Sequence, residues 1–325
     1  MKIRSAISLF CLVSVFACGD PRRSVGELIE VAADPGRGFN YPYFLTVPHA
    51  NQASRLPWLV VESNNTGTVS DDFTVHHASA RSQAQGNSLG PMIAREFGLP
   101  SLTPVFPRSE SGWQTYTHAL DQDCLAIQSG DLYRIDLQLI AMIEDARGRL
   151  RERDWTVNEE IILAGFSASG SLANRFSLLH PERVKLVAAG GLNGMLMLPI
   201  PELDSHALDY PLGLNDYALL TGREFPSAQW NRLPQFLFMG ADDDNDATQY
   251  ADAYSDAERT VIYAALGETM QPDRWVRCQQ AYFAAGANTV FRTYEGVAHG
   301  TSSLVHRELL EFVGEVLGGQ VRTTK

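Results

Sequence analysis

The stretch Gly-Phe-Ser-Ala-Ser-Gly at positions 165–170 constrains the fold of this 325-residue chain more than any other feature. An apolar run at 161–164 precedes it, and a helix-like segment follows at 171–179. A serine on a tight turn between a strand and a helix is typical of a nucleophile elbow, where the turn requires small residues on both sides of the serine. The sequence therefore predicts an elbow with Ser167 at its apex, against the alternative of an ordinary turn rich in small residues.

Two serines of this stretch have small neighbours, so both satisfy the steric rule. Ser169 stands where a second glycine is usual. Ser167 is preferred because the elbow should begin close to the end of the strand, which falls near Ala164. A serine hydroxyl needs a base to activate it and a third group to orient that base. The prediction therefore requires an acid and a histidine further along the chain.

The chain supplies both groups just after predicted strands. Residues 234–240 form a short apolar run ending in glycine, and acidic residues crowd the segment 241–246 that follows. Residues 289–294 alternate like a strand and lead to His299, after which 302–317 has the pattern of an amphipathic helix. Side chains that follow separate strands of a parallel sheet can converge on one edge of that sheet.

This ordered set of serine, acid and histidine resembles the α/β-hydrolase superfamily over residues 39–318. The resemblance implies Ser167 as the nucleophile, His299 as the base and an aspartate of the acidic segment as the orienting acid. In that family the acid commonly lies three residues beyond the glycine that ends its strand. Counting from Gly240 therefore indicates Asp243.

The acidic segment leaves other interpretations open. Asp246 is the second candidate for the orienting acid, because the path of the loop cannot be inferred from the sequence. A solvated loop or an oxygen-rich calcium site would have a similar composition, although the glycine and glutamate of an EF-hand are missing. No His-x-x-x-His or Cys-x-x-Cys spacing predicts zinc, and no cofactor is implied.

The expected chemistry also needs two backbone N–H groups aimed at the developing negative charge. One should come from Ala168, the residue after the nucleophile, and the other from the loop after the third strand. That loop, at 62–67, lacks the usual His-Gly pair. Asn64 or Asn65 is the expected second donor, with its side chain able to assist.

Strands and helices alternate along most of the chain, which predicts an α/β fold with a mostly parallel central sheet flanked by helices. His76 and His77 are expected in an exposed loop after the third strand. The insertion 192–232 carries apolar and aromatic residues that either form a cap over the site or pack onto the body, and 247–286 is a second, mainly helical excursion. Further strands are expected at 39–47, 57–62, 102–107 and 184–190, and further helices at 88–97 and 135–150.

The N-terminus has the pattern of a targeting segment. Residues 1–17 combine a basic start with an apolar stretch too short to span a bilayer, as in a signal peptide. Cys18 follows, which resembles a bacterial lipobox and predicts a lipidated cysteine after cleavage. Ordinary signal cleavage with secretion, or a plain membrane anchor, are the alternatives. We expect a tether at 18–38 and a loose tail at 319–325.

Two cysteines, Cys124 and Cys278, remain outside the signal segment and the lipidation site. Export to an oxidising compartment allows a disulfide between them. The sequence does not show whether they lie within bonding distance, so two free buried thiols are the equal alternative.

The charge balance argues against one class of partner. Lys and Arg number 26 against 38 Asp and Glu, which gives a net charge of −12. This excess of negative charge, without any basic run, argues against nucleic-acid binding. Contact with a membrane is expected through the N-terminal lipid only.

The resemblance implies an exported serine hydrolase that cleaves small or polymeric carboxylic esters through an acyl-enzyme. Within the superfamily the chain is most similar to secreted esterases and polyhydroxyalkanoate-depolymerase-like proteins. We expect short acyl chains and negligible amide cleavage, because an alkoxide leaves more readily than an unprotonated amine. A serine peptidase of the same fold and a non-catalytic, surface-displayed binding protein are the alternatives.

Overall fold

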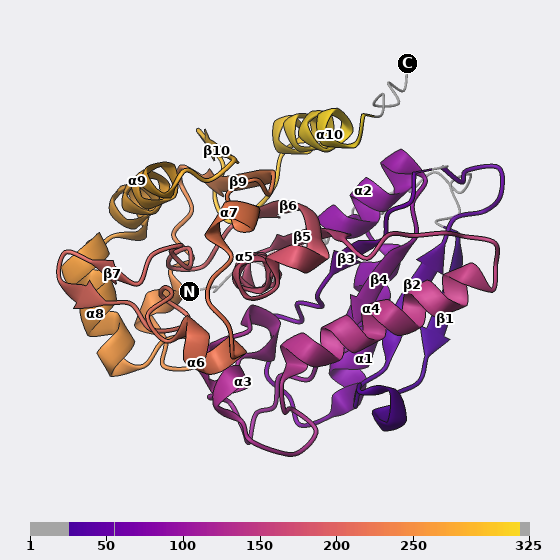
Figure 1. Cartoon of the computed structure of the whole chain (residues 1–325), viewed down its shortest axis with the longest axis horizontal. Coiled ribbons are helices and arrows are strands. Elements are labelled where there is room, and N and C mark those ends of the chain that lie inside the picture. Colours follow the sequence, from indigo (N-terminus) through magenta and orange to yellow (C-terminus); the bar gives the residue numbers. More distant parts are fainter. Residues whose placement is uncertain (1–25, 55, 319–325) are drawn as a thin grey trace, which may run out of the picture.

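An eight-stranded sheet forms the centre of the computed structural model, which describes residues 26–54 and 56–318 (Figure 1). The first two pairs of neighbours in the sheet are antiparallel, and the others are parallel. The prediction of a mostly parallel α/β sheet is therefore confirmed. In spatial order the strands are β1 (Glu27–Val31), β2 (Tyr43–Val47), β4 (Ser101–Pro104), β3 (Val60–Glu62), β5 (Ile161–Phe166), β6 (Val184–Gly190), β9 (Gln235–Gly240) and β10 (Thr289–Tyr294).

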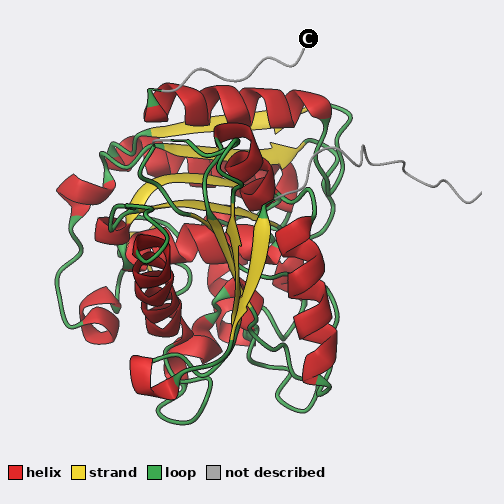
Figure 2. Ribbon diagram, turned by 90° about the vertical axis from the view of Figure 1, so that its right-hand side faces the viewer, coloured by secondary structure: helices red, strands yellow, loops and turns green. Residues whose placement is uncertain are grey.

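Helices cover both faces of the sheet (Figure 2). On one face lie α1 (Phe73–Gln85), α2 (Leu89–Phe97) and α10 (Ser303–Leu317). On the other face lie α4 (Ile135–Arg151), α5 (Ala168–Leu179) and α9 (Trp275–Ala285). The remaining elements are α3 (Gln122–Ala126), α6 (Tyr217–Thr221), α7 (Ser227–Trp230), α8 (Asp256–Leu266), a hairpin of β7 (Glu202–Leu203) and β8 (His206–Ala207), and the short turns η1 (Pro35–Arg37), η2 (Thr117–Ala119), η3 (Pro181–Arg183), η4 (Ala247–Gln249) and η5 (Met270–Arg274).

The alternation of side chains along β5 divides the core into two layers. Ile161 and Leu163 join the cluster beneath α4 and α5, whereas Ile162 and Ala164 join the cluster beneath α2 and α10. All four are completely buried. Burial on both faces explains why this strand is a continuous apolar run. Each large aliphatic side chain stabilises the strand by roughly 1.5–3 kcal/mol, so the strand that leads to the elbow is held firmly.

The folded domain begins earlier than the sequence predicts. The expected tether 18–38 contains β1, which pairs with β2 in a register from Glu27 opposite Val47 to Val31 opposite Tyr43. The domain boundary expected at residue 39 is therefore wrong, because a strand of five residues at the sheet edge has too little periodicity to be recognised. The signal segment 1–17, Cys18 and the tail 319–325 lie outside the described residues.

A second correction concerns the segment after β3. His76 and His77 lie within α1, whose N-cap Asp72 accepts a hydrogen bond from the Thr74 backbone N–H at 2.9 Å. His76 is completely buried, and its Nδ1 lies 3.1 Å from Thr66 Oγ1. The expected exposed loop is therefore a helix. Its small and polar residues leave few apolar positions that would mark it in the sequence.

The cysteines do not form the disulfide that the sequence allows. Cys124 in α3 and Cys278 in α9 are both free and completely buried in the larger core cluster. Burial raises the pKa of the Cys278 thiol to about 12 and that of Cys124 well above its ordinary value. Both side chains therefore act as small apolar residues.

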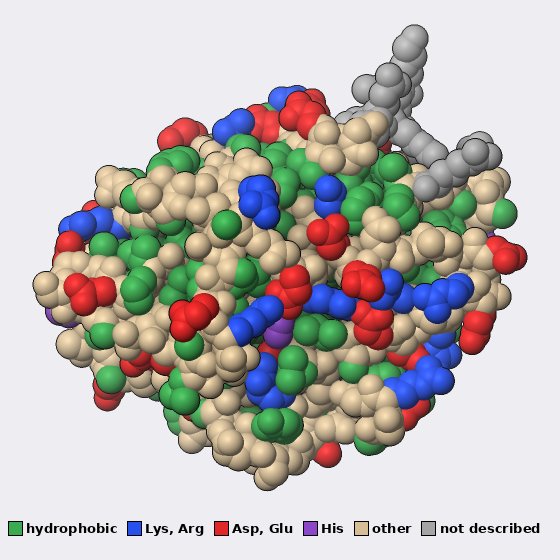
Figure 3. All heavy atoms as spheres, viewed as in Figure 1, with side chains coloured by type: hydrophobic (Ala, Val, Ile, Leu, Met, Phe, Trp, Pro, Cys, Tyr) green, Lys and Arg blue, Asp and Glu red, His purple; other side chains and the backbone are tan. Residues whose placement is uncertain are grey.

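Within the described residues, no helix combines the length and the apolar character needed to cross a bilayer. On the face shown in Figure 3, acidic and basic side chains are interspersed and no large patch of one sign is seen.

Candidate active site

A strained turn joins β5 to α5 and presents Ser167. Ser167 has φ +61° and ψ −129°, a conformation that residues other than glycine rarely adopt, and α5 begins at the next residue. Such strain persists only where the surrounding structure enforces it, and it is frequent at functional sites. Of the two serines that the sequence leaves open, the structure places Ser167 at the apex of the turn.

Ser169 has a different place in the same turn. Its Oγ donates to the Phe166 carbonyl oxygen at 2.8 Å and lies 3.0 Å from the Phe166 N–H, and its side chain is buried. The Ser169 hydroxyl therefore stabilises the turn through these two hydrogen bonds and is buried beneath it. Gly165 is required because an added Cβ would lie 2.2 Å from the backbone oxygen of Ser169.

His299 and Asp243 are brought together after the last two strands of the sheet. His299 Nδ1 lies 3.0 Å from Asp243 Oδ2 and 3.1 Å from Oδ1. The Asp243 side chain is buried, and that of His299 is 25% exposed. This contact assigns the ring proton to Nδ1 and leaves the lone pair on Nε2. Gly240 allows the two loops to meet, because a Cβ there would lie 2.0 Å from the Val297 carbonyl oxygen.

Asp246, the second candidate acid, has a structural role. Its carboxylate pairs with the guanidinium of Arg274, which is completely buried, and it accepts a hydrogen bond from the Thr248 N–H at 3.0 Å. It therefore anchors the loop after β9 and does not contact His299. No group of three or more His, Cys, Asp or Glu residues that could hold a metal ion occurs in the part of the chain that the structure describes.

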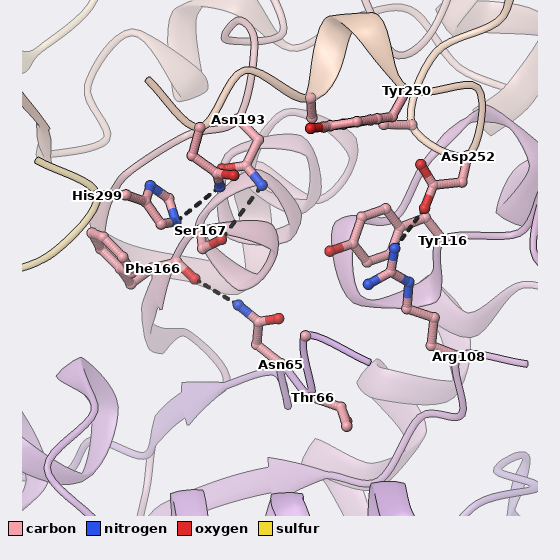
Figure 4. Close-up of a pocket in the computed structure, with 14 residues that line it drawn as sticks. Asn65, Thr66, Arg108, Tyr116, Phe166, Ser167, Asn193, Tyr250, Asp252 and His299 are labelled. Atoms are coloured by element: carbon pink, nitrogen blue, oxygen red, sulfur yellow. Dashed lines mark hydrogen bonds and ion pairs between the residues drawn. The ribbon is translucent and has the colours of Figure 1, made fainter. Parts of the chain in front are cut away.

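Two asparagines that the sequence does not single out connect His299 to Ser167 through hydrogen bonds (Figure 4). Asn245 Nδ2 donates to His299 Nε2 at 3.1 Å and to Asn193 Oδ1 at 3.3 Å. Asn193 Nδ2 in turn donates to Ser167 Oγ at 3.4 Å. Within residues 26–54 and 56–318, no direct hydrogen bond joins Ser167 to His299. The only hint in the sequence is position, since each asparagine follows the end of a sheet strand.

These residues line a pocket of about 620 Å³. Its walls come from the loops 65–67, 108–116 and 245–253, with Ser167 and His299 on one side (Figure 4). From the predicted cap at 192–232, Asn193 is the one described residue that lines the pocket. The apolar and aromatic residues of that insertion pack into the core instead, so the segment belongs to the body. The start of the second insertion borders the pocket in its place.

The three predicted oxyanion donors have different surroundings in the structure. Ala168 is the first residue of α5, where a backbone N–H has no partner within the helix. Asn65 lines the pocket, but its backbone N–H donates to Gln83 Oε1 at 3.0 Å, and its Nδ2 donates to the Phe166 carbonyl oxygen at 3.3 Å. Asn64 is completely buried and is not among the residues that line the pocket, and its side chain bonds the Phe106 carbonyl oxygen and N–H.

No protein-family model and no curated protein matches this sequence. Solved structures do. The LpqC poly(3-hydroxybutyrate) depolymerase from Bordetella parapertussis aligns with 92% of this chain and 91% of its own, at a TM-score of 0.50 and 15% identity. The chain has the α/β-hydrolase fold. The expectation from the ordered serine, acid and histidine is confirmed at the level of the fold.

Two further solved structures have a similar fold. An S-formylglutathione hydrolase from Agrobacterium tumefaciens has a TM-score of 0.49 and 14% identity, covering 90% of this chain and 94% of its own. A thermostable esterase has a TM-score of 0.47 and 17% identity over 89% of this chain. The match covers 62% of that esterase, less than two thirds of its length. Identities this low describe the fold, so the reaction has to be argued from the site.

Proposed function

We propose that this α/β-hydrolase is a serine hydrolase that cleaves carboxylic esters. The observation that carries the proposal is the elbow: a serine held at φ +61° opens onto a pocket that also contains a histidine hydrogen-bonded to a buried aspartate. A strained serine beside an oriented base is the arrangement that nucleophilic catalysis needs.

In the proposed reaction, Ser167 Oγ attacks the carbonyl carbon of the ester while its proton passes to His299 Nε2. Asp243 keeps the imidazole oriented and stabilises its charged form. The carbonyl oxygen becomes an oxyanion, for which the Ala168 N–H and the Asn65 side chain are the proposed donors. The tetrahedral intermediate collapses, and the alkoxide leaves with the proton from Nε2. Water then attacks the acyl-enzyme with the same base, releasing the acid and restoring the serine.

The resting hydrogen bonds impose one condition on this sequence. The His299 Nε2 lone pair accepts from the Asn245 amide. This amide therefore has to move away before Nε2 can take the proton of Ser167. Asn193, which already contacts Ser167 Oγ, is placed to donate to a substrate oxygen once the amides separate.

The test uses a fluorophosphonate probe together with a panel of p-nitrophenyl esters. Wild type should be labelled and should hydrolyse short acyl esters, whereas Ser167→Ala should lose both the label and nearly all turnover. His299→Ala should behave like Ser167→Ala, because such groups act as a unit. Ser169→Ala loses the hydroxyl that bonds Phe166 within the turn, so it should be labelled more slowly than wild type but should not lose the label. Equal labelling of wild type and Ser167→Ala would reject the proposed nucleophile.

A parallel panel of aminoacyl p-nitroanilides distinguishes esters from amides. Faster Ser167-dependent cleavage of an anilide than of every ester would favour a peptidase. No turnover on either panel, together with no fluorophosphonate labelling, would favour the non-catalytic binding protein.

We also propose that the enzyme is exported and anchored through a lipid on Cys18, since residues 1–18 have the pattern of a lipoprotein signal. Radiolabelled palmitate should enter the expressed protein and be absent from Cys18→Ser. Release of unmodified wild type into the medium would instead support simple secretion.

A further inference from the structure

One wall of the pocket carries an ionic group that the proposed reaction does not use. Arg108, in the loop after β4, lines the pocket, and its side chain is 12% exposed. Its Nη2 donates to Asp252 Oδ2 at 2.5 Å, and its guanidinium carbon lies 3.8 Å from the centre of the Tyr116 ring. A guanidinium stacked on an aromatic ring and paired with a carboxylate is held in one orientation.

The backbone around this group is fixed as well. The Arg108 carbonyl oxygen accepts from the Ser70 N–H at 2.9 Å, and its backbone nitrogen lies 3.3 Å from His76 Nε2. The Tyr116 N–H donates to the buried carboxylate of Asp121 at 2.7 Å. The guanidinium is therefore preorganised, so a ligand that binds it would not have to order it first.

Donors remain available on this group. A guanidinium has five N–H groups. Among the described residues, one on Nη2 donates to Asp252, and the Nε–H is buried with no hydrogen-bond partner. In Figure 4 the guanidinium and the Tyr116 ring lie between Asp252 and Ser167, and the Tyr116 hydroxyl points toward Ser167. A substrate group that extends from Ser167 along the pocket thus meets N–H and O–H donors before it meets a carboxylate.

We propose that Arg108, assisted by the Tyr116 hydroxyl, binds a free carboxylate on the substrate. This inference rests on the proposed ester hydrolysis and names its substrate class. The preferred substrates are esters that carry a second, ionised carboxyl group, such as half-esters of dicarboxylic acids or acylated hydroxy acids. Asp252 accepts one hydrogen bond from the guanidinium and offsets part of its charge.

The test measures a selectivity ratio. The kcat/KM for monomethyl glutarate is divided by that for its neutral isostere, in which an amide replaces the free carboxylate. A second pair, 3-acetoxypropanoate and its amide, carries the carboxylate on the alcohol side of the ester, and the same ratio is measured for it. Methyl and acetyl esters are used because a neighbouring carboxylate attacks an aryl ester without any enzyme. A charge-assisted hydrogen bond predicts a ratio of about 10 to 100 for at least one pair of substrates.

Matched variants test whether the preference for the charged substrate depends on the pair of Arg108 and Asp252. Arg108→Gln combined with Asp252→Asn removes both charges at nearly constant shape, and the ratio should fall to about one. Asp252→Asn alone should raise the ratio, because the guanidinium loses its compensating charge. Arg153→Gln is the control, since Arg153 pairs with Glu27 on the surface outside the pocket, and it should keep the wild-type ratio.

Several results would overturn the inference. They are a wild-type ratio of one or less for both pairs, a ratio unchanged in the double variant, or a ratio lowered by Asp252→Asn. The last measurement also decides the matter if the double variant fails to fold. A preference for methyl 6-aminohexanoate that Asp252→Asn abolishes would show that the pair binds cations instead.

Failure of the inference can be distinguished from failure of the proposed function. Ser167-dependent hydrolysis of dimethyl glutarate without any charge preference would leave the esterase proposal intact and reject the carboxylate site. If no ester is hydrolysed, calorimetric titration of Ser167→Ala protein with monomethyl glutarate still decides. Binding that is lost when Arg108→Gln and Asp252→Asn are added supports the site, and absence of binding rejects it.

Discussion

Replacing Gly165 by alanine tests whether the elbow depends on the space that this glycine leaves. An added Cβ would lie 2.2 Å from the Ser169 carbonyl oxygen, 2.4 Å from its carbonyl carbon and 2.7 Å from the Gly170 nitrogen. All three atoms belong to the backbone of the first turn of α5, so no side-chain rotation can relieve the clash. The start of the helix would have to move by about 1 Å to restore an ordinary contact of 3.4 Å.

Both stability and reactivity should respond to Gly165→Ala. Overpacking a core costs about 1–3 kcal/mol, and we expect the upper end because backbone atoms have to move. A displacement of about 1 Å at the nucleophile lowers the reaction rate by roughly 100-fold. The free energy of unfolding would be measured by denaturant titration, and the reactivity of Ser167 by the rate of fluorophosphonate labelling.

Gly148, in the last turn of α4, provides the matched control. No atom lies within 4 Å of a Cβ added there. Gly148→Ala should therefore stabilise the protein by about 0.5–1 kcal/mol, the cost of glycine in a helix interior, and leave the labelling rate unchanged. Wild-type stability and labelling in Gly165→Ala would refute the steric argument.

The remaining predictions separate chemistry from structure around the same loops. Asp243→Asn should lower kcat by about 10³- to 10⁴-fold with little loss of stability. Asp246→Asn should remove the carboxylate that pairs with the buried Arg274 guanidinium and mainly lower the denaturation midpoint. Asn245→Ala should raise the fluorophosphonate labelling rate about two- to tenfold, the equivalent of one neutral hydrogen bond, because its amide no longer occupies the base; a slower rate would contradict this. Burial raises the pKa of Glu62 from 4.5 to about 7, so the folded chain retains a proton that the unfolded chain releases, and the free energy of unfolding should fall as pH rises through that range. Glu62→Gln should make this decline shallower in denaturation measured at several pH values.

The sequence predicts the sheet and the positions of the serine, acid and histidine for one physical reason. Each follows a buried strand whose apolar run is continuous, and parallel strands bring their ends to one edge. Counting from Gly240 leads to Asp243, and because the turn after β9 is short, its carboxylate lies 3.0 Å from His299 Nδ1.

Other parts could not be predicted because loop paths decide them. Asn193 and Asn245 meet across 52 residues of sequence, and Arg108 meets Asp252 across 144. No local pattern encodes such contacts. The insertion 192–232 illustrates a related ambiguity, since apolar residues that bury in the body have the same composition as those that would cover a site.

The conformation of Ser167 implies that natural selection for function and selection for stability oppose each other at this position. A non-glycine residue in a sparsely populated backbone region costs on the order of 1–3 kcal/mol, and glycine would relieve much of that cost while removing the hydroxyl. Libraries screened only for heat resistance or soluble yield should therefore enrich Ser167→Gly, a variant that is more stable but lacks the hydroxyl that the proposed function requires. Any engineering campaign on this chain would need an activity filter in every round, or its best survivors would be the ones that have lost the proposed nucleophile.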